Sequence, residues 1–83
     1  MDYTVYILQS YLTKRYYIGM TSDLEKRLSY HNNGRNKSTK HGMPWVICYY
    51  ERCDSKKSAW LRERQIKSYK GGVAFKKLVE NNR

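Results

Sequence analysis

Five side chains of this 83-residue chain are of the types that act on phosphate esters. They are Tyr6, Tyr17, Arg27, His31 and Glu63. A guanidinium can bind the non-bridging oxygens of a phosphodiester and stabilise the charge that develops during attack. A carboxylate can hold a Mg²⁺-type ion, which supplies Lewis acidity. A phenol, with a reference pKa of about 10, becomes a useful base only if nearby cations lower that value. If the five side chains converge, they form a set that phosphodiester hydrolysis can use.

Arg27 and His31 lie at the margin of the apolar face of an expected helix. Leu24, Leu28 and His31 follow the i, i+4, i+7 spacing of one helical face. Arg27 is four residues before His31, so their side chains are neighbours on that helix. A purely structural interpretation is equally open from this segment: the arginine stem would lie along the helix edge, and the histidine would be satisfied in the core.

Glu63 falls in line with small and apolar residues of a second expected helix. Ala59, Glu63 and Ile66 follow the i, i+4, i+7 spacing, and Tyr69 and Lys70 complete the stripe. A buried carboxylate is costly unless it is paired or coordinates a metal. The pattern therefore predicts either a metal ligand or a structural ion pair with Arg27 or a lysine.

The two tyrosines lie in segments typical of strands. Residues 3–8 and 15–20 are rich in β-branched and aromatic side chains and are separated by a polar connector, which predicts a β-hairpin. Tyr6 and Tyr17 are both in the middle of their strands, so their side chains could meet across the hairpin. Gly19 predicts either a bulge or a close approach of another group to the backbone.

Start and stop signals delimit the first helix. Ser22 followed three residues later by Glu25 matches a capping box. The helix should continue to about Asn33, with Gly34 as its C-terminal stop. Residues 35–43 are polar, basic and without periodicity, so we expect a surface loop.

The rest of the chain predicts one more strand and two more helices. The strand is expected over residues 44–51, with Pro44 at its first position. The second helix should be capped by Asp54 or Ser55 and end at two consecutive glycines, and a last helix should cover residues 73–80. The fold class is therefore α+β: a three-stranded antiparallel sheet with packed helices in the order ββαβαα.

The charge balance favours a polyanionic partner. The chain carries 17 Lys+Arg against 7 Asp+Glu, a formal net charge of +10. A field of this size attracts nucleic acid, which is the commonest such partner. Charge alone is also compatible with a role in solubility only, and it says nothing about chemistry.

Other classes of protein are disfavoured. No segment approaches the run of about 18 apolar residues that a membrane helix needs. Asp2 stands before a short apolar run with no basic region, so we expect no signal peptide, no membrane partner and a cytoplasmic location. Cys48 and Cys53 do not form a CxxC pair, and the two histidines do not complete a zinc spacing. We therefore expect neither a zinc site nor a disulfide framework.

Two short motifs carry a resemblance to a known family. The triplet Thr-Val-Tyr ends at Tyr6, and Tyr-Ile-Gly follows at residues 17–19, with ten residues between them, 7–16. Further matching segments are 21–32, 38–51 and 59–71. On these motifs nearly the whole chain resembles the GIY-YIG nuclease superfamily, in particular its small stand-alone bacterial members of the UPF0213 type.

The resemblance implies a fold, a reaction and a set of site residues. It implies one GIY-YIG domain over residues 1–83 and an inverting, in-line hydrolysis of a DNA phosphodiester. It implies one divalent cation per site, Mg²⁺ or Mn²⁺. Carried over to this chain, the motif tyrosines are Tyr6 and Tyr17, the catalytic arginine is Arg27, the helix histidine is His31 and the metal-binding glutamate is Glu63.

The chain departs from the family pattern at two places. Thr4 and Val5 replace the glycine and isoleucine of the first motif, which a strand tolerates. A late asparagine found in many members would correspond to Asn81 or Asn82. No appended DNA-binding domain is expected, so we expect a monomer whose specificity comes from these residues or from a protein partner.

Three functions are compatible with these observations. The first is a metal-dependent DNA endonuclease, structure-selective or weakly specific, whose substrate could be a repair intermediate. The alternative is a basic nucleic-acid-binding module with the same fold and no significant turnover, and the third is a small protein-interaction domain. The basic residues expected to bind phosphates are Lys26, Arg35, Lys37, Lys40, Lys67 and Lys70.

Overall fold

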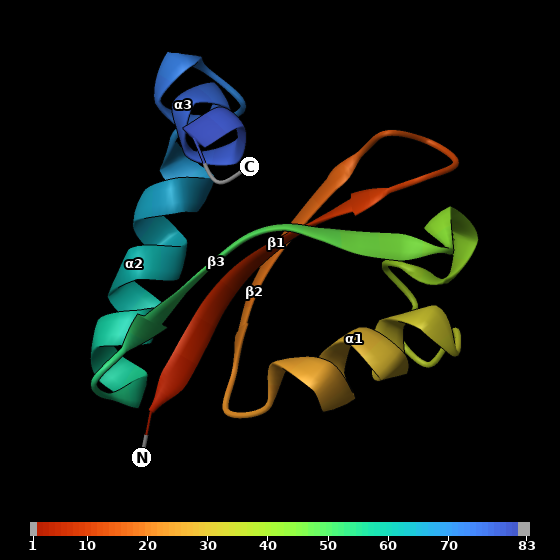
Figure 1. Ribbon diagram of the computed structural model, residues 1–83, viewed down its shortest axis with the longest axis horizontal. Coiled ribbons are helices and arrows are strands. Elements are labelled where there is room, and N and C mark those ends of the chain that lie inside the picture. The colour runs from red at the N-terminus through yellow and green to blue at the C-terminus, as the bar shows by residue number, and fades with distance from the viewer. Residues whose placement is uncertain (1, 82–83) are drawn as a thin grey trace.

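The protein is an α+β fold in which helices cover both faces of a small sheet (Figure 1). The computed structural model describes residues 2–81. The elements are β1 (Tyr3–Ser10), β2 (Tyr16–Thr21), α1 (Leu24–Asn32), the short 3₁₀ helix η1 (Lys40–Gly42), β3 (Trp45–Cys53), α2 (Lys56–Ser68) and α3 (Val73–Asn81). The expected ββαβαα order is confirmed. Asn82 lies outside the described residues, as does the side chain of Asn81, so the position of the late asparagine stays a prediction.

The sheet has the strand order β2-β1-β3, and both pairs of neighbours are antiparallel. In the hairpin, Tyr6 is paired with Gly19 and Leu8 with Tyr17, so the two tyrosines are diagonal neighbours on one face. The pairing of β1 with β3 shifts register after Ile7, which marks a β-bulge in β3. The central strand β1 therefore organises the whole sheet.

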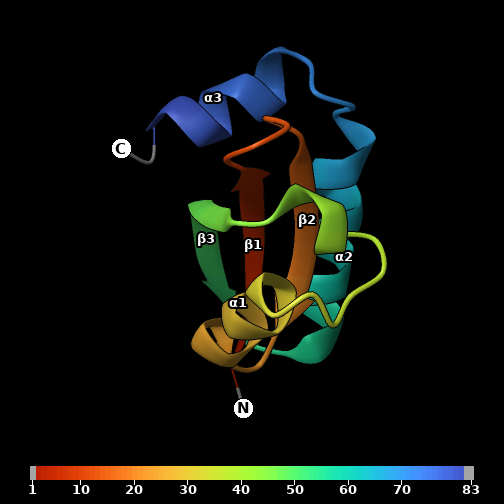
Figure 2. The same cartoon turned by 90° about the vertical axis from the view of Figure 1, so that its right-hand side faces the viewer.

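Alternate residues of β1 enter two different cores. Val5 and Ile7 are fully buried against Ala59 and Ile66 of α2 and against Phe75 of α3. A second cluster, on the opposite face, contains Tyr6, Leu8 and Trp45, with Tyr17, Leu24 and Leu28 packed around them. Figure 1 shows α1 and α2 on opposite sides of the sheet, and Figure 2 shows α3 crossing its end. The period-2 pattern of β1 thus supplies side chains to a separate core on each face of the sheet.

The first helix begins one residue later than the expected capping box. Asp23 is the N-cap, and its carboxylate accepts a hydrogen bond from the backbone N–H of Lys26 (3.1 Å). Thr21 accounts for the difference, because its hydroxyl accepts from the N–H of Asp23 (3.1 Å) and fixes the chain just before the helix. The expected stop is confirmed: Asn33 is the C-cap, and Gly34 has a φ of 71°.

The segment expected to be a plain surface loop is partly buried. Thr39 is fully buried and Gly42 is buried within η1. The indole N–H of Trp45 donates to the carbonyl of Thr39 (2.7 Å), and the hydroxyl of Ser10 donates to the carbonyl of Gly42 (2.6 Å). These tertiary hydrogen bonds draw a polar segment into the structure, which no local pattern could indicate.

Two further boundaries differ from expectation. The third strand starts at Trp45, after Pro44, and continues to Cys53. Helix α2 is capped by Ser55, one of the two expected residues, but it ends at Ser68. Lys70 is exposed and has a φ of 50°, so it does not extend the buried stripe of α2.

Candidate active site

The ring of Tyr6 crosses the backbone of β2 at Gly19. A Cβ atom at residue 19 would lie 2.6 Å from the Tyr6 hydroxyl oxygen and 2.7 Å from the ring carbon that carries it. Real Cβ atoms do not approach other atoms so closely, so only glycine leaves room for this phenol. The expected close approach at Gly19 is therefore confirmed, and the group that approaches is Tyr6.

His31 is fully buried and joins Tyr6 to the loop that follows α1. Its Nε2 lies 3.1 Å from the Tyr6 hydroxyl oxygen, and its Nδ1 lies 2.8 Å from the hydroxyl oxygen of Thr39. The Thr39 hydroxyl also donates to the carbonyl of Asn36 (3.5 Å). Because that carbonyl can only accept, the hydroxyl hydrogen of Thr39 points to Asn36, and the Thr39 oxygen accepts from Nδ1–H of His31. His31 is then neutral, and its Nε2 accepts from the Tyr6 hydroxyl.

Helix α1 is fastened to the sheet close to this chain of hydrogen bonds. The side-chain amide of Asn32 donates to the carbonyl of Trp45 (3.1 Å) and accepts from its backbone N–H (2.6 Å). These two hydrogen bonds join the end of α1 to the start of β3, and so they fix the position of the neighbouring His31 relative to the sheet.

Tyr17 and Arg27 lie beside the buried pair. The Tyr17 ring centroid is 4.8 Å from that of His31 and 6.4 Å from that of Tyr6. Tyr17 and Arg27 are both partly exposed, whereas Tyr6 is only 2% exposed. The site thus has an inner layer that water does not reach and an outer layer that it does.

The electrostatics of this site reflect burial first. Burial raises the pKa of Tyr6, the neighbouring Tyr17 adds to the rise, and the Arg27 guanidinium opposes it. Burial lowers the pKa of His31, and the Arg27 charge lowers it further. The Arg27 charge does lower the pKa of Tyr6, but desolvation outweighs it, so Tyr6 does not meet the condition set for a phenol that acts as a base.

Glu63 acts on this site electrostatically. Its charge contributes to raising the pKa of Tyr6 although it comes from α2, on the other side of the sheet. Its side chain is 16% exposed, in keeping with the inward stripe of α2, and its Oε2 lies 2.6 Å from the Nζ of Lys67. The structure therefore contains the ion pair with a lysine that was one of the two sequence-based interpretations.

The donor set around Glu63 fits one hydrated cation. Within residues 2–81 no group of three or more His, Cys, Asp or Glu side chains could hold a metal. Mg²⁺ keeps several waters and is commonly held by one or two carboxylates together with substrate phosphates. One carboxylate, that of Glu63, meets the protein's part of that requirement, provided that Lys67 releases Oε2. Lys67 is 54% exposed, so its ammonium group can turn into solvent.

The six basic residues expected to bind phosphates are all exposed. Lys26 and Arg35 line a hollow on α1, whereas Lys67 is held by Glu63.

Two residues near the site were not predicted from the sequence. Thr39 has no local signal at all, because its role depends on a tertiary contact with His31. Tyr30 does have a local signal, because it stands three residues after Arg27 and the two side chains therefore share a helix face.

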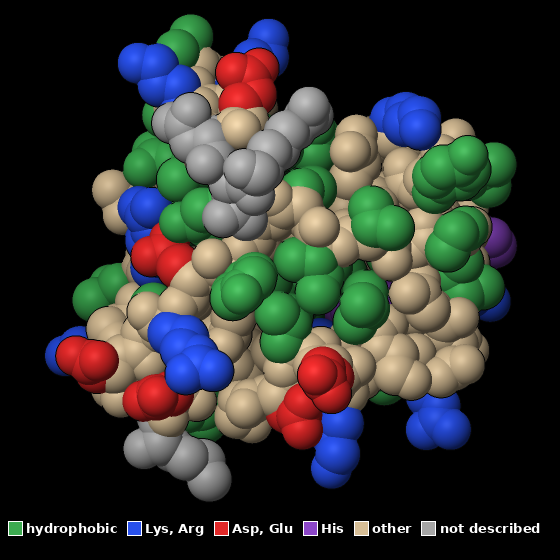
Figure 3. Space-filling model, in the orientation of Figure 1, with side chains coloured by type: hydrophobic (Ala, Val, Ile, Leu, Met, Phe, Trp, Pro, Cys, Tyr) green, Lys and Arg blue, Asp and Glu red, His purple; other side chains and the backbone are tan. Residues whose placement is uncertain are grey.

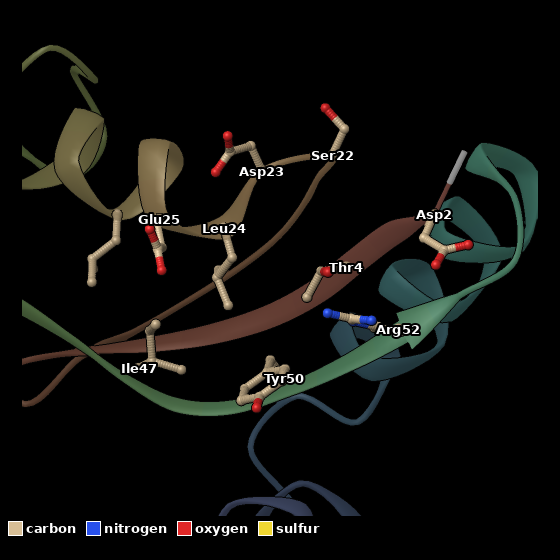
Figure 4. A pocket seen from close by; sticks show the side chains of 10 residues that line it. Asp2, Thr4, Ser22, Asp23, Leu24, Glu25, Ile47, Tyr50 and Arg52 are labelled. Carbon is tan, nitrogen blue, oxygen red and sulfur yellow. The ribbon is translucent and has the colours of Figure 1, made fainter.

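A different hollow, of about 670 Å³, opens between the sheet and the start of α1 (Figure 4). Leu24, Ile47 and Tyr50 give it an apolar wall, and Figure 3 shows hydrophobic side chains gathered over this part of the sheet. Its rim carries three acids and one arginine, which are Asp2, Asp23, Glu25 and Arg52. None of the five candidate site residues lines it, and its acids would repel a phosphate backbone.

No helix among residues 2–81 has both the length and the apolar character to cross a membrane.

Comparisons with known proteins found a matching family model and similar proteins. The family model described as the GIY-YIG catalytic domain matches residues 2–76. A UPF0213 protein of Streptococcus pyogenes serotype M3 is 40% identical over 67 residues, which cover 80% of this chain and 72% of that protein. A UPF0213 protein of serotype M5 matches to the same extent.

A solved structure is also similar. The solution NMR structure of a UPF0213 protein from Bacillus halodurans has a TM-score of 0.50 and 28% sequence identity, and the match covers 89% of this chain and 90% of that one. The family match spans both tyrosine motifs, the α1 helix and Glu63. The chain therefore belongs to the GIY-YIG nuclease family and is similar to its UPF0213 proteins.

Proposed function

We propose that this chain is a single-domain, metal-dependent endonuclease that hydrolyses a DNA phosphodiester. The observation that carries the proposal is the cluster of Tyr6, Tyr17 and His31 from three elements, together with the charges of Arg27 and Glu63, which both act on Tyr6. In a protein that only binds DNA, a carboxylate here weakens the binding of a phosphate, so its presence needs either a metal or a structural ion pair to explain it.

Arg27 is proposed to bind the scissile phosphate. It is partly exposed, so a substrate can reach its guanidinium, and its charge already acts on both Tyr6 and His31. A fixed guanidinium can form paired hydrogen bonds to phosphate oxygens and stabilise the charge that increases in the transition state.

The two tyrosines are proposed to have different roles. Tyr17 reaches the surface, so its phenol can contact the bound phosphate or the attacking water. Tyr6 is buried, and its raised pKa keeps it protonated at neutral pH, so its one O–H donates to His31 and we assign Tyr6 a positioning role beside Tyr17. His31 is fully buried and acts through Tyr6, so we assign it a positioning role.

Glu63 is proposed to hold one Mg²⁺ or Mn²⁺ ion together with the substrate phosphate. A divalent cation bound there would supply Lewis acidity to the phosphorus centre and screen the charge that develops. Glu63 would orient that site from α2, opposite Arg27 of α1. The ammonium group of Lys67 would leave Glu63 and become available to a neighbouring phosphate.

The test is cleavage of supercoiled plasmid and of branched oligonucleotides in Mg²⁺, Mn²⁺ or EDTA. We expect nicking in the metals, none in EDTA, and none with Glu63→Gln. The matched control is Glu51→Gln, because Glu51 is also a partly exposed carboxylate in an ion pair, with Arg62 at 2.7 Å. Glu51→Gln should cleave like the wild type, although it should melt at a lower temperature.

The second candidate is a nucleic-acid-binding module without significant turnover. One observation favours it: the ion pair of Glu63 with Lys67 gives the partly buried carboxylate a structural reason to exist. If purified protein binds DNA in every condition but cleaves in none, and Glu63→Gln binds as well as or better than wild type, this second function replaces the first.

A further inference from the structure

Tyr30 occupies a distinctive position on the outer surface of α1. It directly precedes the buried His31, yet the residue itself is 36% exposed. The guanidinium carbon of Arg27 lies over the Tyr30 ring, 5.2 Å from its centroid. Tyr30 therefore contacts the residue proposed to bind the scissile phosphate, while leaving ring surface for a ligand.

Two hollows meet at Tyr30. One, of about 360 Å³, is lined by Thr21, Lys26, Arg27 and Tyr30, together with Ser22 and Asp23. The other, of about 320 Å³, is lined by Lys26, Ser29, Tyr30, Asn33 and Arg35. Tyr30 and Lys26 belong to both. The aromatic ring thus stands between two recesses whose charged side chains are mostly basic.

The chemistry of these recesses is that of a nucleotide site. Lys26 and Arg35 can bind phosphates, and Ser29 and Asn33 offer polar groups that can contact the edge of a base. The hollow in Figure 4 provides the contrast, because it has an apolar wall but an acidic rim. A nucleic acid strand that leaves Arg27 is therefore favoured on the Tyr30 side of α1 and disfavoured on the other.

We propose that Tyr30 and its two recesses bind one unstacked nucleotide next to the scissile phosphate, so that the preferred substrate is branched or single-stranded DNA. This inference rests on the proposed function, since it places the scissile phosphate at Arg27. It extends that function by naming the class of substrate and a residue that selects it.

The preference follows from the state of the bases in each substrate. An exposed aromatic ring gains binding energy by stacking on a base that has no neighbour. In a continuous duplex every base is already stacked, so the base must first be extruded at a cost of unpairing. A nucleotide at a flap or junction avoids that cost. Tyr30 therefore strengthens the binding of a branched substrate much more than that of a duplex.

The experiment measures equilibrium binding in EDTA, where cleavage plays no part. Fluorescence anisotropy compares a continuous duplex, the same duplex with a single-stranded flap, and the flap strand alone. Tyr30→Ala should lose about tenfold in affinity for the flap and the single strand, and less than about twofold for the duplex. Tyr30→Phe, which keeps the stacking surface, should bind like the wild type.

A matched control and a direct readout complete the design. Tyr11 is an exposed tyrosine with the Lys14 ammonium 4.7 Å from its ring centroid, and it lies in the β1–β2 connection. Tyr11→Ala should change none of the affinities. The fluorescence of 2-aminopurine at the flap nucleotide beside the junction should be quenched by wild type and Tyr30→Phe, and not by Tyr30→Ala.

The outcomes separate this inference from the proposed function. Equal losses on all three probes, unquenched 2-aminopurine with the wild type, or no binding by the wild type would each overturn the Tyr30 site. If the wild type binds with the expected Tyr30 dependence but never cleaves in Mg²⁺ or Mn²⁺, the nuclease proposal fails and the nucleotide site stands. If the wild type cleaves branched and continuous DNA equally, and Tyr30→Ala has no effect, the nuclease proposal stands and the nucleotide site at Tyr30 fails.

Discussion

The Nε2 atom of His31 lies 3.1 Å from the hydroxyl oxygen of Tyr6, in a contact buried between α1 and β1. Two polar side chains thus satisfy each other in a core that is otherwise mainly apolar and aromatic. Thr39 completes the arrangement from the far side of the imidazole. Stability and site geometry therefore depend on the same hydrogen bonds, and a change in one should be measurable in the other.

Thr39→Val should destabilise the protein by about 1–3 kcal/mol, because it leaves the Nδ1 of His31 without a partner in the core. Thr39→Ser keeps the hydroxyl and is the matched control. The free energy of unfolding in urea measures both. Both variants keep the backbone carbonyl of residue 39 that accepts from Trp45, so any difference between their unfolding free energies measures the contribution of the hydroxyl. Equal stability of the two would mean that the His31–Thr39 contact contributes nothing.

The stability of the protein should fall as the pH falls below about 6.5, the ordinary pKa of histidine. Burial and Arg27 lower the pKa of His31, so in this range the unfolded chain binds a proton at residue 31 that the folded chain does not. Stability therefore rises with pH up to about 6.5 and is fully present above it. One proton limits the slope from His31 to about 1.4 kcal/mol per pH unit.

Unfolding free energies between pH 5 and 8 provide the measurement. His31→Gln should lower the stability near neutral pH and reduce the slope below about pH 6.5. His41→Gln is the control, because His41 is exposed in η1 and should leave the slope as it is. An unchanged slope in His31→Gln would show that this buried histidine does not govern the pH dependence.

Gly19→Ala should impair both stability and cleavage, because the new methyl group would meet the Tyr6 hydroxyl oxygen at 2.6 Å. Overpacking of this kind costs about 1–3 kcal/mol. Gly71→Ala is the comparison: Gly71 has a φ of 74° and no atom within 4 Å of an added Cβ, so only its backbone is strained. Both variants should melt at a lower temperature, but only Gly19→Ala should lose nuclease activity at a temperature where both are folded.

The sequence predicted best those features that depend on local periodicity. The β-branched and aromatic content of residues 3–8 and 15–20 predicted the hairpin, and the helical spacing of Leu24, Leu28 and His31 placed His31 at the margin of the inward face. At Gly19 one of the two predicted alternatives, the close approach of another group, is confirmed. Each of these depends on neighbours within one element or across one hairpin, where spacing and geometry are tightly linked.

The sequence could not predict contacts whose partners are set by the tertiary fold. Thr39 lies in a polar stretch without periodicity, and its burial depends on Trp45 and His31, which belong to other elements. The Arg27 cation lowers the pKa of Tyr6, but burial, which is a property of the folded chain, raises it by more. Whether the five site residues act in catalysis stays a prediction, which the experiments above test.

Lys67→Met should increase the affinity of the protein for Mn²⁺ about twofold in the absence of nucleic acid. The ammonium group of Lys67 is paired with Oε2 of Glu63, the atom that the cation would bind. An ion pair between residues i and i+4 stabilises a helix by about 0.2–0.5 kcal/mol. Loss of the Lys67 ion pair should therefore strengthen cation binding by at most about the same free energy. Titration of free Mn²⁺ by electron paramagnetic resonance measures the change. Glu63→Gln should abolish binding in both backgrounds.

The matched control for Lys67 is Arg62→Met, which breaks the other ion pair of the described chain, at Glu51. Its Mn²⁺ affinity should equal that of the wild type, because that pair lies outside the candidate site. If Lys67→Met and Arg62→Met gave the same affinity, competition between Lys67 and the cation would be excluded. If Mn²⁺ binding also persisted in Glu63→Gln, the carboxylate of Glu63 could not be the metal ligand, and the proposed division of roles between α1 and α2 would be wrong.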